Sequence, residues 1–412
     1  MKKPKVHYAW VISLACCILL FVSSGLAIGG FSIYLPNVKD ANDFSNTQVS
    51  VIITVRSFLG LVSKLVVLWL IQKIEIRYTM TMACMMAGIA YLLYANSSTL
   101  TGFCIASAFA GMSYGFGSIT PTSIVLHRWF KKKLDIALSI CATGAGVAAL
   151  ICPAFITFLI LNYDLPTAFY GIAFFCFFGG IIAFLLIRNY PADKALEPFG
   201  SKYAETMKSD SLSGNLPNIP IVHSISSRRL ILLYAAPLLL GAIALNCQSL
   251  YMLYFTEKGY SNIIVALAIS INGLTLLIGK AAYGFAANYL GHGKTSCLFL
   301  LLLIAGLVVG CFASYSKQLL FCSAALTGAG VSTTSVGMSI WVDDFVPAEK
   351  YDLETKRFQV FFAMGGLIFS LLPGIMADFF GGFLSVYILY IGFAFVVYII
   401  VSQTYHTINI RC

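Results

Sequence analysis

The feature that most constrains this chain is a series of apolar stretches, each long enough to cross a lipid bilayer as a single α-helix. Roughly 20 apolar residues span about 30 Å of hydrocarbon, and a helix is favoured there because it satisfies its backbone hydrogen bonds internally. We therefore predict an all-α membrane protein. Its twelve transmembrane helices are expected at residues 9–35, 48–72, 79–95, 100–126, 134–161, 166–187, 230–256, 262–290, 295–315, 318–342, 357–377 and 382–403.

The composition agrees with a surface that faces lipid. Hydrophobic residues make up 59% of the chain and charged residues only 10%, whereas a soluble domain carries about 25% charged residues. The net charge of +10 does not indicate nucleic-acid binding, because the basic residues lie in short loops between apolar stretches. The 12 cysteines show no CxxC spacing, which favours reduced packing residues over disulfides or a metal site. We expect the lipid bilayer as a partner, no nucleic acid, no metal and no cofactor.

The distribution of lysine and arginine predicts the orientation in the membrane. If the N-terminus is cytoplasmic, the cytoplasmic flanks hold 20 of the 26 basic residues and the outer loops hold three, Lys39, Lys258 and Lys317. Such a bias is typical of cytoplasmic loops. We therefore expect a multi-pass protein of the plasma or inner membrane, with both termini cytoplasmic.

The longest polar loop divides the helices into two groups of six. We predict an N-terminal six-helix bundle at 1–187, a cytoplasmic interdomain loop at 188–229 and a C-terminal six-helix bundle at 230–412. The turn after the second helix lies 216 residues before the turn after the eighth, which indicates a repeat. Two pseudo-symmetric halves with a substrate site near the midplane between them are typical of secondary transporters.

Three cations are predicted inside the hydrocarbon, whereas all 16 acidic residues fall in loops or at helix ends. Arg56 and Lys64 lie on the second helix, and Lys280 lies on the eighth helix, 216 residues after Lys64. A charge at the bilayer centre costs roughly 2.5–3.5 kcal/mol. With no intramembrane carboxylate to pair these cations, we hypothesise that an anionic substrate supplies the countercharge. The alternative is that they bond to carbonyls or hydroxyls at helix interfaces.

Polar side chains predicted at membrane depth are further candidates for substrate binding. They have groups that can orient an anion, although such groups also join neighbouring helices. These candidates are Tyr114, Asn246, Gln248 and Asn272.

The same sequence argues against an enzyme. All five histidines fall in loops or at helix ends, and the chain has no HExxH, Gly-x-Ser-x-Gly or Walker-type motif. We expect no catalytic residues and no ATP coupling within this chain.

Across nearly its whole length the chain resembles the major facilitator superfamily. The superfamily signature between helices two and three, Gly-x-x-x-Asp-Arg-x-Gly-x-Arg/Lys, is present only in part here, with Lys73 and Arg77 in place and Glu75 at the glycine position. In the second half Gly284, Gly291 and Lys294 match, while Asn288 and Tyr289 replace Asp and Arg. The resemblance implies gating residues at the cytoplasmic helix ends. The candidates are Lys73, Arg77, Arg128, Asp343 and Asp344, with Lys131–Lys133 facing the two aspartates.

The closer resemblance is to the branch of monocarboxylate transporters and oxalate/formate antiporters. It rests on Tyr34-Leu35-Pro36 ending the first helix, on Arg128-Trp129-Phe130, and on Lys280-Ala-Ala-Tyr-Gly284, where the branch has a substrate-binding Arg in place of Lys. Proton-coupled members carry an Asp where this chain has Leu276, and a Lys where it has Asn37. These departures favour anion exchange or facilitated diffusion over proton symport.

The resemblance and the buried cations together predict a transporter that moves a small organic anion, a mono- or dicarboxylate, by alternating access. We expect an exchanger that functions as a monomer, with helices one, four, seven and ten and Lys280 lining the cavity. Two alternatives stay open: a superfamily exporter of drugs or neutral small molecules, and a non-transporting membrane receptor or scaffold.

Overall fold

The computed structural model describes residues 7–201, 227–347 and 350–409, without the side chains of a few of these residues, Gln248 among them. Within these ranges twelve helical spans are long and apolar enough to cross a membrane, which confirms the predicted all-α membrane fold. The spans are Tyr8–Ala41, Asn46–Lys73, Ile76–Ala95, Leu100–Trp129, Ile136–Asn162, Leu165–Leu186, Arg229–Cys247, Asn262–Leu290, His292–Cys311, Lys317–Phe345, Leu353–Phe380 and Leu384–Thr407.

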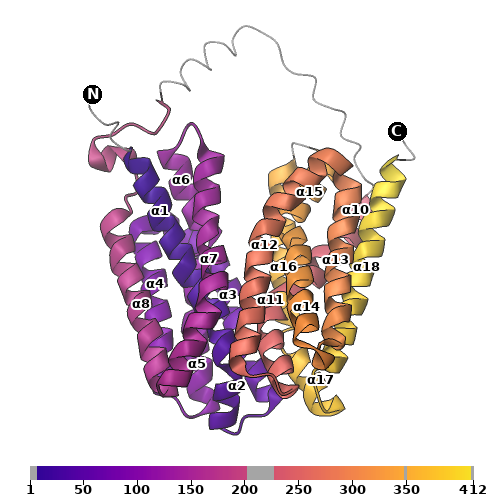
Figure 1. Cartoon of the computed structure of the whole chain (residues 1–412). Coiled ribbons are helices and arrows are strands. Elements are labelled where there is room, and N and C mark those ends of the chain that lie inside the picture. Colours follow the sequence, from indigo (N-terminus) through magenta and orange to yellow (C-terminus); the bar gives the residue numbers. More distant parts are fainter. Residues whose placement is uncertain (1–6, 202–226, 348–349, 410–412) are drawn as a thin grey trace. The chain divides into compact units, whose positions relative to one another are not determined.

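Several spans are built from more than one helical element (Figure 1). The first half contains α1 (Tyr8–Leu20), η1 (Phe21–Gly30), α2 (Phe31–Ala41), α3 (Asn46–Lys73), α4 (Ile76–Ala95), α5 (Leu100–Phe116), α6 (Ile119–Trp129), α7 (Leu134–Asn162), α8 (Leu165–Leu186) and η2 (Pro191–Lys194). The second half contains α10 (Ser227–Leu233), α11 (Ala235–Glu257), α12 (Asn262–Leu290), α13 (His292–Cys311), η3 (Ala313–Tyr315), α14 (Lys317–Val331), η4 (Ser332–Thr334), α15 (Val336–Phe345), α16 (Tyr351–Ile368), α17 (Leu372–Phe380) and α18 (Leu384–Asn409).

The helix positions confirm the predicted repeat of six helices. The starts of α3 and α12 are 216 residues apart, as are the starts of α4 and α13 and the ends of α6 and α15. The interruption of the fourth span after Phe116 and that of the tenth span at Ser332–Thr334 fall at matching places in the two repeats. The two halves therefore have the same order of helices and the same helix interruptions.

Close packing divides the described residues into two compact units. Unit 1 takes the residues up to Phe31, Phe58–Ala148 and those from Leu159 to 201. Unit 2 takes Ser32–Ser57, Ala149–Phe158 and the described residues of the second half. Two segments of the first half therefore pack with the helices of the second half. The division into bundles at 1–187 and 230–412 stays a prediction about which parts move together.

The first part of the predicted interdomain loop packs on unit 1. The backbone N–H of Phe199 donates to the carbonyl of Trp129, and the N–H of Lys131 donates to the carbonyl of Phe199. The Phe199 ring lies edge-on to the rings of His7 and Trp10. Residues 202–226 of the loop lie outside the described ranges.

The first span differs from the sequence-based expectation. The helix does not end at Tyr34-Leu35-Pro36 but continues through Pro36 to Ala41. It also contains a ten-residue π-helical stretch, η1, in which each N–H bonds a carbonyl one residue farther away than in an α-helix. Proline within a membrane helix is tolerated where the backbone adjusts locally and neighbouring groups satisfy the freed carbonyl. The sequence pattern did not reveal this adjustment.

Glycines allow the backbones of α11 and α16 to approach closely in unit 2. A Cβ atom at Gly365 would lie 1.8 Å from the carbonyl oxygen of Leu238, and one at Gly241 would lie 1.9 Å from the carbonyl oxygen of Phe362. Small residues at such interfaces are typical of membrane helices, where van der Waals packing drives association.

We therefore expect Gly365→Ala to destabilise the protein by about 1–3 kcal/mol, because the added methyl group forces α11 and α16 apart. Gly284→Ala is the matched control, since a Cβ atom there would meet no atom within 4 Å. Thermal melting of the purified protein in detergent measures the difference. Equal melting temperatures for the two variants would contradict the close approach of these helices.

Candidate functional site

Lys64 and Tyr114 form a cation–π pair in unit 1. The ammonium nitrogen (Nζ) of Lys64 lies 4.0 Å from the centroid of the Tyr114 ring. Both side chains are half-buried, Lys64 on α3 and Tyr114 on α5. Such a contact contributes about 0.5–2 kcal/mol, more when water is excluded. The structure thus brings together two of the predicted substrate-binding residues.

The Lys64–Tyr114 pair lies beside the interruption of the fourth span. A Cβ atom at Gly115 would lie 2.8 Å from the backbone nitrogen of Lys64, so α3 and α5 are in close contact there. At the interruption the Ser23 hydroxyl on η1 donates to the carbonyl of Gly117 at 2.7 Å. Ser118 is 5% exposed, and its hydroxyl has no hydrogen-bond partner in the described part of the chain. A cation, an interrupted helix and a free hydroxyl therefore occur in one small region.

Lys280 occupies the corresponding place in unit 2. Its neighbour Gly279 is packed against the end of α14, where a Cβ atom would lie 3.1 Å from Cα of Ala329 and 3.4 Å from Cβ of Ser332. Ser332 begins the interruption of the tenth span. Within the described residues, Lys280 is half-buried and takes part in no hydrogen bond, ion pair or ring contact. An unpaired ammonium group at membrane depth attracts an anion, because an opposite charge removes the cost of its burial.

The remaining predicted binding residues differ in their surroundings. Arg56 on α3 is 2% exposed. Asn246 donates to the carbonyl of Ala242, at 3.0 Å, and to that of Gly366 on α16, at 3.4 Å. Asn272 donates to the carbonyl of Ala324 and the hydroxyl of Thr327, both at 3.0 Å. The two asparagines thus join neighbouring helices, the role that intramembrane amides commonly have. The side chain of Gln248 lies outside the described part of the structure.

Three of the predicted gating residues lie at the ends of their helices in unit 1, and each contacts an aromatic residue there. The Lys73 Nζ lies 4.4 Å from the ring centroid of Trp69. The Arg77 guanidinium donates from Nε to the carbonyl of Phe184 at 2.7 Å and covers its ring. The Arg128 guanidinium lies 4.4 Å from the ring centroid of Tyr190. Arg77 therefore joins α4 to α8, and Arg128 joins the end of α6 to the residue before η2, whereas Lys73 covers a ring of its own helix.

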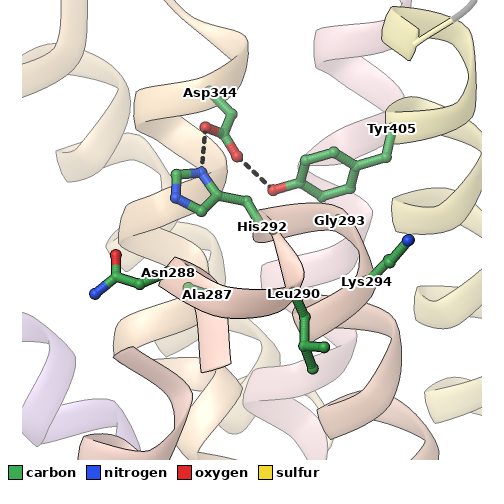
Figure 2. A pocket seen from close by; sticks show the side chains of 9 residues that line it. Ala287, Asn288, Leu290, His292, Gly293, Lys294, Asp344 and Tyr405 are labelled. Atoms are coloured by element: carbon green, nitrogen blue, oxygen red, sulfur yellow. Dashed lines mark hydrogen bonds and ion pairs between the residues drawn. The ribbon is translucent and has the colours of Figure 1, made fainter. Parts of the chain in front are cut away.

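The predicted gating residue Asp344 lines an open pocket of about 580 Å³ at one end of unit 2 (Figure 2). Its carboxylate lies 2.7 Å from Nδ1 of His292 and accepts a hydrogen bond of 2.6 Å from the Tyr405 hydroxyl. Figure 2 shows Asp344 between these two partners. The carboxylate thereby holds the ends of α13, α15 and α18 together. Its neighbour Asp343 is exposed.

A second carboxylate cluster was not anticipated from the sequence. Glu354 on α16 is 2% exposed, accepts a short hydrogen bond from the Tyr234 hydroxyl, and pairs with Arg357 at 2.7 Å. The sequence could have indicated only the ion pair, because Glu354 and Arg357 lie one helical turn apart. The partner Tyr234 lies 120 residues earlier in the chain, so no local pattern indicated it.

Known structures with the same fold transport several kinds of solute. The nucleoside transporter NupG is 11% identical, with a TM-score of 0.73 over 97% of this chain and 99% of that chain. The D-xylose–proton symporter is 11% identical, with a TM-score of 0.71 over 96% of each chain. A bacterial homolog of the human lysosomal transporter Spinster, in an inward-facing and occupied conformation, is 11% identical, with a TM-score of 0.70 over 99% and 98%. At these identities the likeness shows the fold alone.

The probable transporter MCH2 of Saccharomyces cerevisiae is similar in sequence to part of the chain. The two are 28% identical over 154 residues, which cover 36% of this chain and 32% of MCH2. The match therefore spans about a third of the length of that relative. The profile of the Major Facilitator Superfamily matches residues 17–267 and 243–406, nearly the whole chain. Together with the twelve spans and the shared fold, this match shows that the chain belongs to the Major Facilitator Superfamily and is a multi-pass membrane transporter, not an enzyme.

Proposed function

We propose that this transporter exchanges a small organic anion, a mono- or dicarboxylate, across the membrane by alternating access. The observation that carries the proposal is Lys280, which is half-buried at membrane depth and has no partner among the described residues. The spacing Lys280-x-x-x-Gly284 resembles the substrate-binding position of monocarboxylate transporters and oxalate/formate antiporters. A lysine there attracts a carboxylate as a point charge, without the two-bond clamp of an arginine.

The contrast between the two lysines supports one primary anion site with a second, assisting cation. Lys64 has a partner, the Tyr114 ring, which partly offsets the cost of burying its charge. Among the described residues no group offsets the burial cost of the Lys280 charge, so Lys280 gains most from a bound carboxylate. The matching positions of the two lysines in the repeat further suggest that each half contributes one cation to substrate binding.

Exchange follows if the protein closes more readily with an anion bound than without one. A ligand shifts a conformational equilibrium only by its differential affinity for the two states. An anion that neutralises Lys280 lowers the cost of enclosing that charge away from water, so the occupied transporter interconverts faster than the empty one. We propose that the single chain acts in the plasma or inner membrane, with both termini cytoplasmic as the basic residues indicate.

Proton coupling is not part of the proposal. Leu276 and Asn37 stand where proton-coupled relatives carry Asp and Lys. The buried carboxylate of Glu354 lies near the start of its span and is occupied by Tyr234 and Arg357. These residues supply no free carboxylate near Lys280.

We expect Lys280→Ala to abolish anion exchange and Lys280→Arg to retain it, because the charge and not the lysine itself is required. The measurement is uptake of labelled formate, oxalate, lactate, pyruvate or succinate into proteoliposomes loaded with the same unlabelled anion. Lys317→Ala is the control, since it removes a cation of the same half at the exposed start of α14. Unchanged exchange by Lys280→Ala, or no exchange of any of these anions by the wild type, would overturn the proposal.

We expect Tyr114→Leu to lower the half-saturating anion concentration about 2–30-fold, because Lys64 loses its cation–π partner and its charge then gains more from a bound carboxylate. Tyr114→Phe keeps the aromatic face and should bind the anion as the wild type does. Initial rates of exchange over a range of external anion concentrations distinguish the two variants. If Leu and Phe at this position give equal half-saturation, the ring does not compensate the Lys64 charge at the anion site.

We also expect an imposed pH gradient to leave the anion at its equilibrium distribution, because Lys280 has no carboxylate partner among the described residues. The measurement compares net accumulation in proteoliposomes with and without a gradient, and with and without a protonophore. Uphill accumulation that the protonophore abolishes, and that protein-free liposomes do not show, would instead establish proton symport.

A further inference from the structure

Unit 2 contains a seam in which two segments of the first half pack against helices of the second half. Ser32 on α2 and Ser249 on α11 share a hydrogen bond of 2.9 Å. The Ser370 hydroxyl donates to that of Thr54 on α3 at 2.8 Å. The seam also brings α7 and α12 together, since a Cβ atom at Gly273 would lie 2.8 Å from the backbone of Ala149. Each of these three contacts joins neutral groups.

A charged group also contacts the first half here: the carboxylate of Asp378 on α17 caps the start of α3. Oδ1 accepts a hydrogen bond of 3.2 Å from the N–H of Asn46, and Oδ2 accepts bonds of 2.8 and 2.6 Å from the N–H and hydroxyl of Thr47. A negative charge is favourable at this position because the start of a helix carries a partial positive charge. Next to this contact Gly374 lies so close that a Cβ atom there would be 2.3 Å from the carbonyl oxygen of Asn46.

The sequence around the start of α3 satisfies only part of this helix end by itself. The first four N–H groups of a helix have no partner within the helix. Ser45 and Gln48 form a reciprocal capping box, in which Gln48 Oε1 accepts from the N–H of Ser45 and Ser45 Oγ accepts from the N–H of Gln48. The N–H groups of Asn46 and Thr47 remain, and the carboxylate of the distant Asp378 accepts both.

We propose that Asp378 is a removable cap that sets how often this seam opens during transport, an inference that rests on the proposed alternating access. Asp378 is exposed, so water can replace it at Asn46 and Thr47 when α3 and α17 separate. The contact can therefore break and re-form without leaving a buried polar group unpaired. A charged cap favours the closed seam, because both the hydrogen bonds and the helix dipole are stronger with a carboxylate than with water.

The test is the accessibility of a cysteine placed in the seam, far along the chain from the cap. Ser249 is 3% exposed, so Ser249→Cys should react with a membrane-impermeant maleimide only when the seam opens. We expect Asp378→Ala to raise the labelling rate roughly tenfold, the ratio that corresponds to about 1.4 kcal/mol. Asp378→Asn should give a smaller increase, because an amide oxygen still accepts hydrogen bonds but carries no charge.

Two controls accompany this measurement. Asp40→Asn removes a carboxylate that is exposed near the end of α2 and should leave the labelling rate unchanged. Each variant is compared with the same protein without the introduced cysteine, which accounts for the native cysteines. Equal labelling in the Asp378 variants and in the Asp40 variant would overturn the proposal. If Asp378→Ala fails to fold, Asp378→Asn alone decides between these outcomes.

The labelling experiment is independent of the transported anion. If labelling rises in Asp378→Ala while no carboxylate is exchanged by the wild type, the seam proposal stands and the proposed substrate class is wrong. If carboxylates are exchanged but labelling is unaffected by Asp378, the substrate class stands and the cap does not control opening. A disulfide between Thr47→Cys and Asp378→Cys gives a second readout, since it should prevent labelling of Ser249→Cys until it is reduced.

Discussion

In hydrocarbon every backbone N–H and carbonyl must find a partner within the protein, and this requirement shapes both the fold and the candidate site. It makes the twelve spans helical, and it limits where a helix can be interrupted to places that offer other partners. At Gly117 the freed carbonyl accepts from Ser23, a residue of the π-helical stretch in the first span. The interruption beside Lys280 is built from residues with hydroxyl side chains, Ser332–Thr334 and Ser335. Lysines and helix interruptions therefore coincide because both need a polar environment at membrane depth.

The same requirement bears on the proposed roles of the two lysines in anion binding. A buried ion pair within the protein would neutralise each lysine permanently, and a substrate would then gain little by binding there. Lys64 is instead paired with an aromatic face, and Lys280 with no described group. A ring offsets only part of the burial cost of a cation, so the charge remains available to an incoming anion. Incomplete neutralisation is thus a condition of the proposed anion recognition at these positions.

The sequence sufficed to predict the twelve spans and the repeat, because helix length and apolar content are local properties. It also placed Lys64 and Lys280 at equivalent positions. The structure confirms this, because α3 and α12 begin at matching positions of the repeat. Tertiary partners were not predictable. Asn246 and Asn272 bond to carbonyls of neighbouring helices, and Asp344 binds His292 and Tyr405, which lie 52 and 61 residues away. The passage of the first helix through Pro36 likewise depends on its neighbours, because proline alone favours termination.

The eleventh span carries a carboxylate near each end, and their different partners bear on how the protein changes state. Glu354 is buried and bound to Tyr234 and Arg357, all within the second half. Asp378 is exposed and binds the start of α3, which belongs to the first half. Breaking the contacts of Glu354 would leave a charge without solvent, whereas water can replace those of Asp378. The buried carboxylate therefore fixes this span within its own half, and the exposed one makes a contact that can break without burying an unpaired charge.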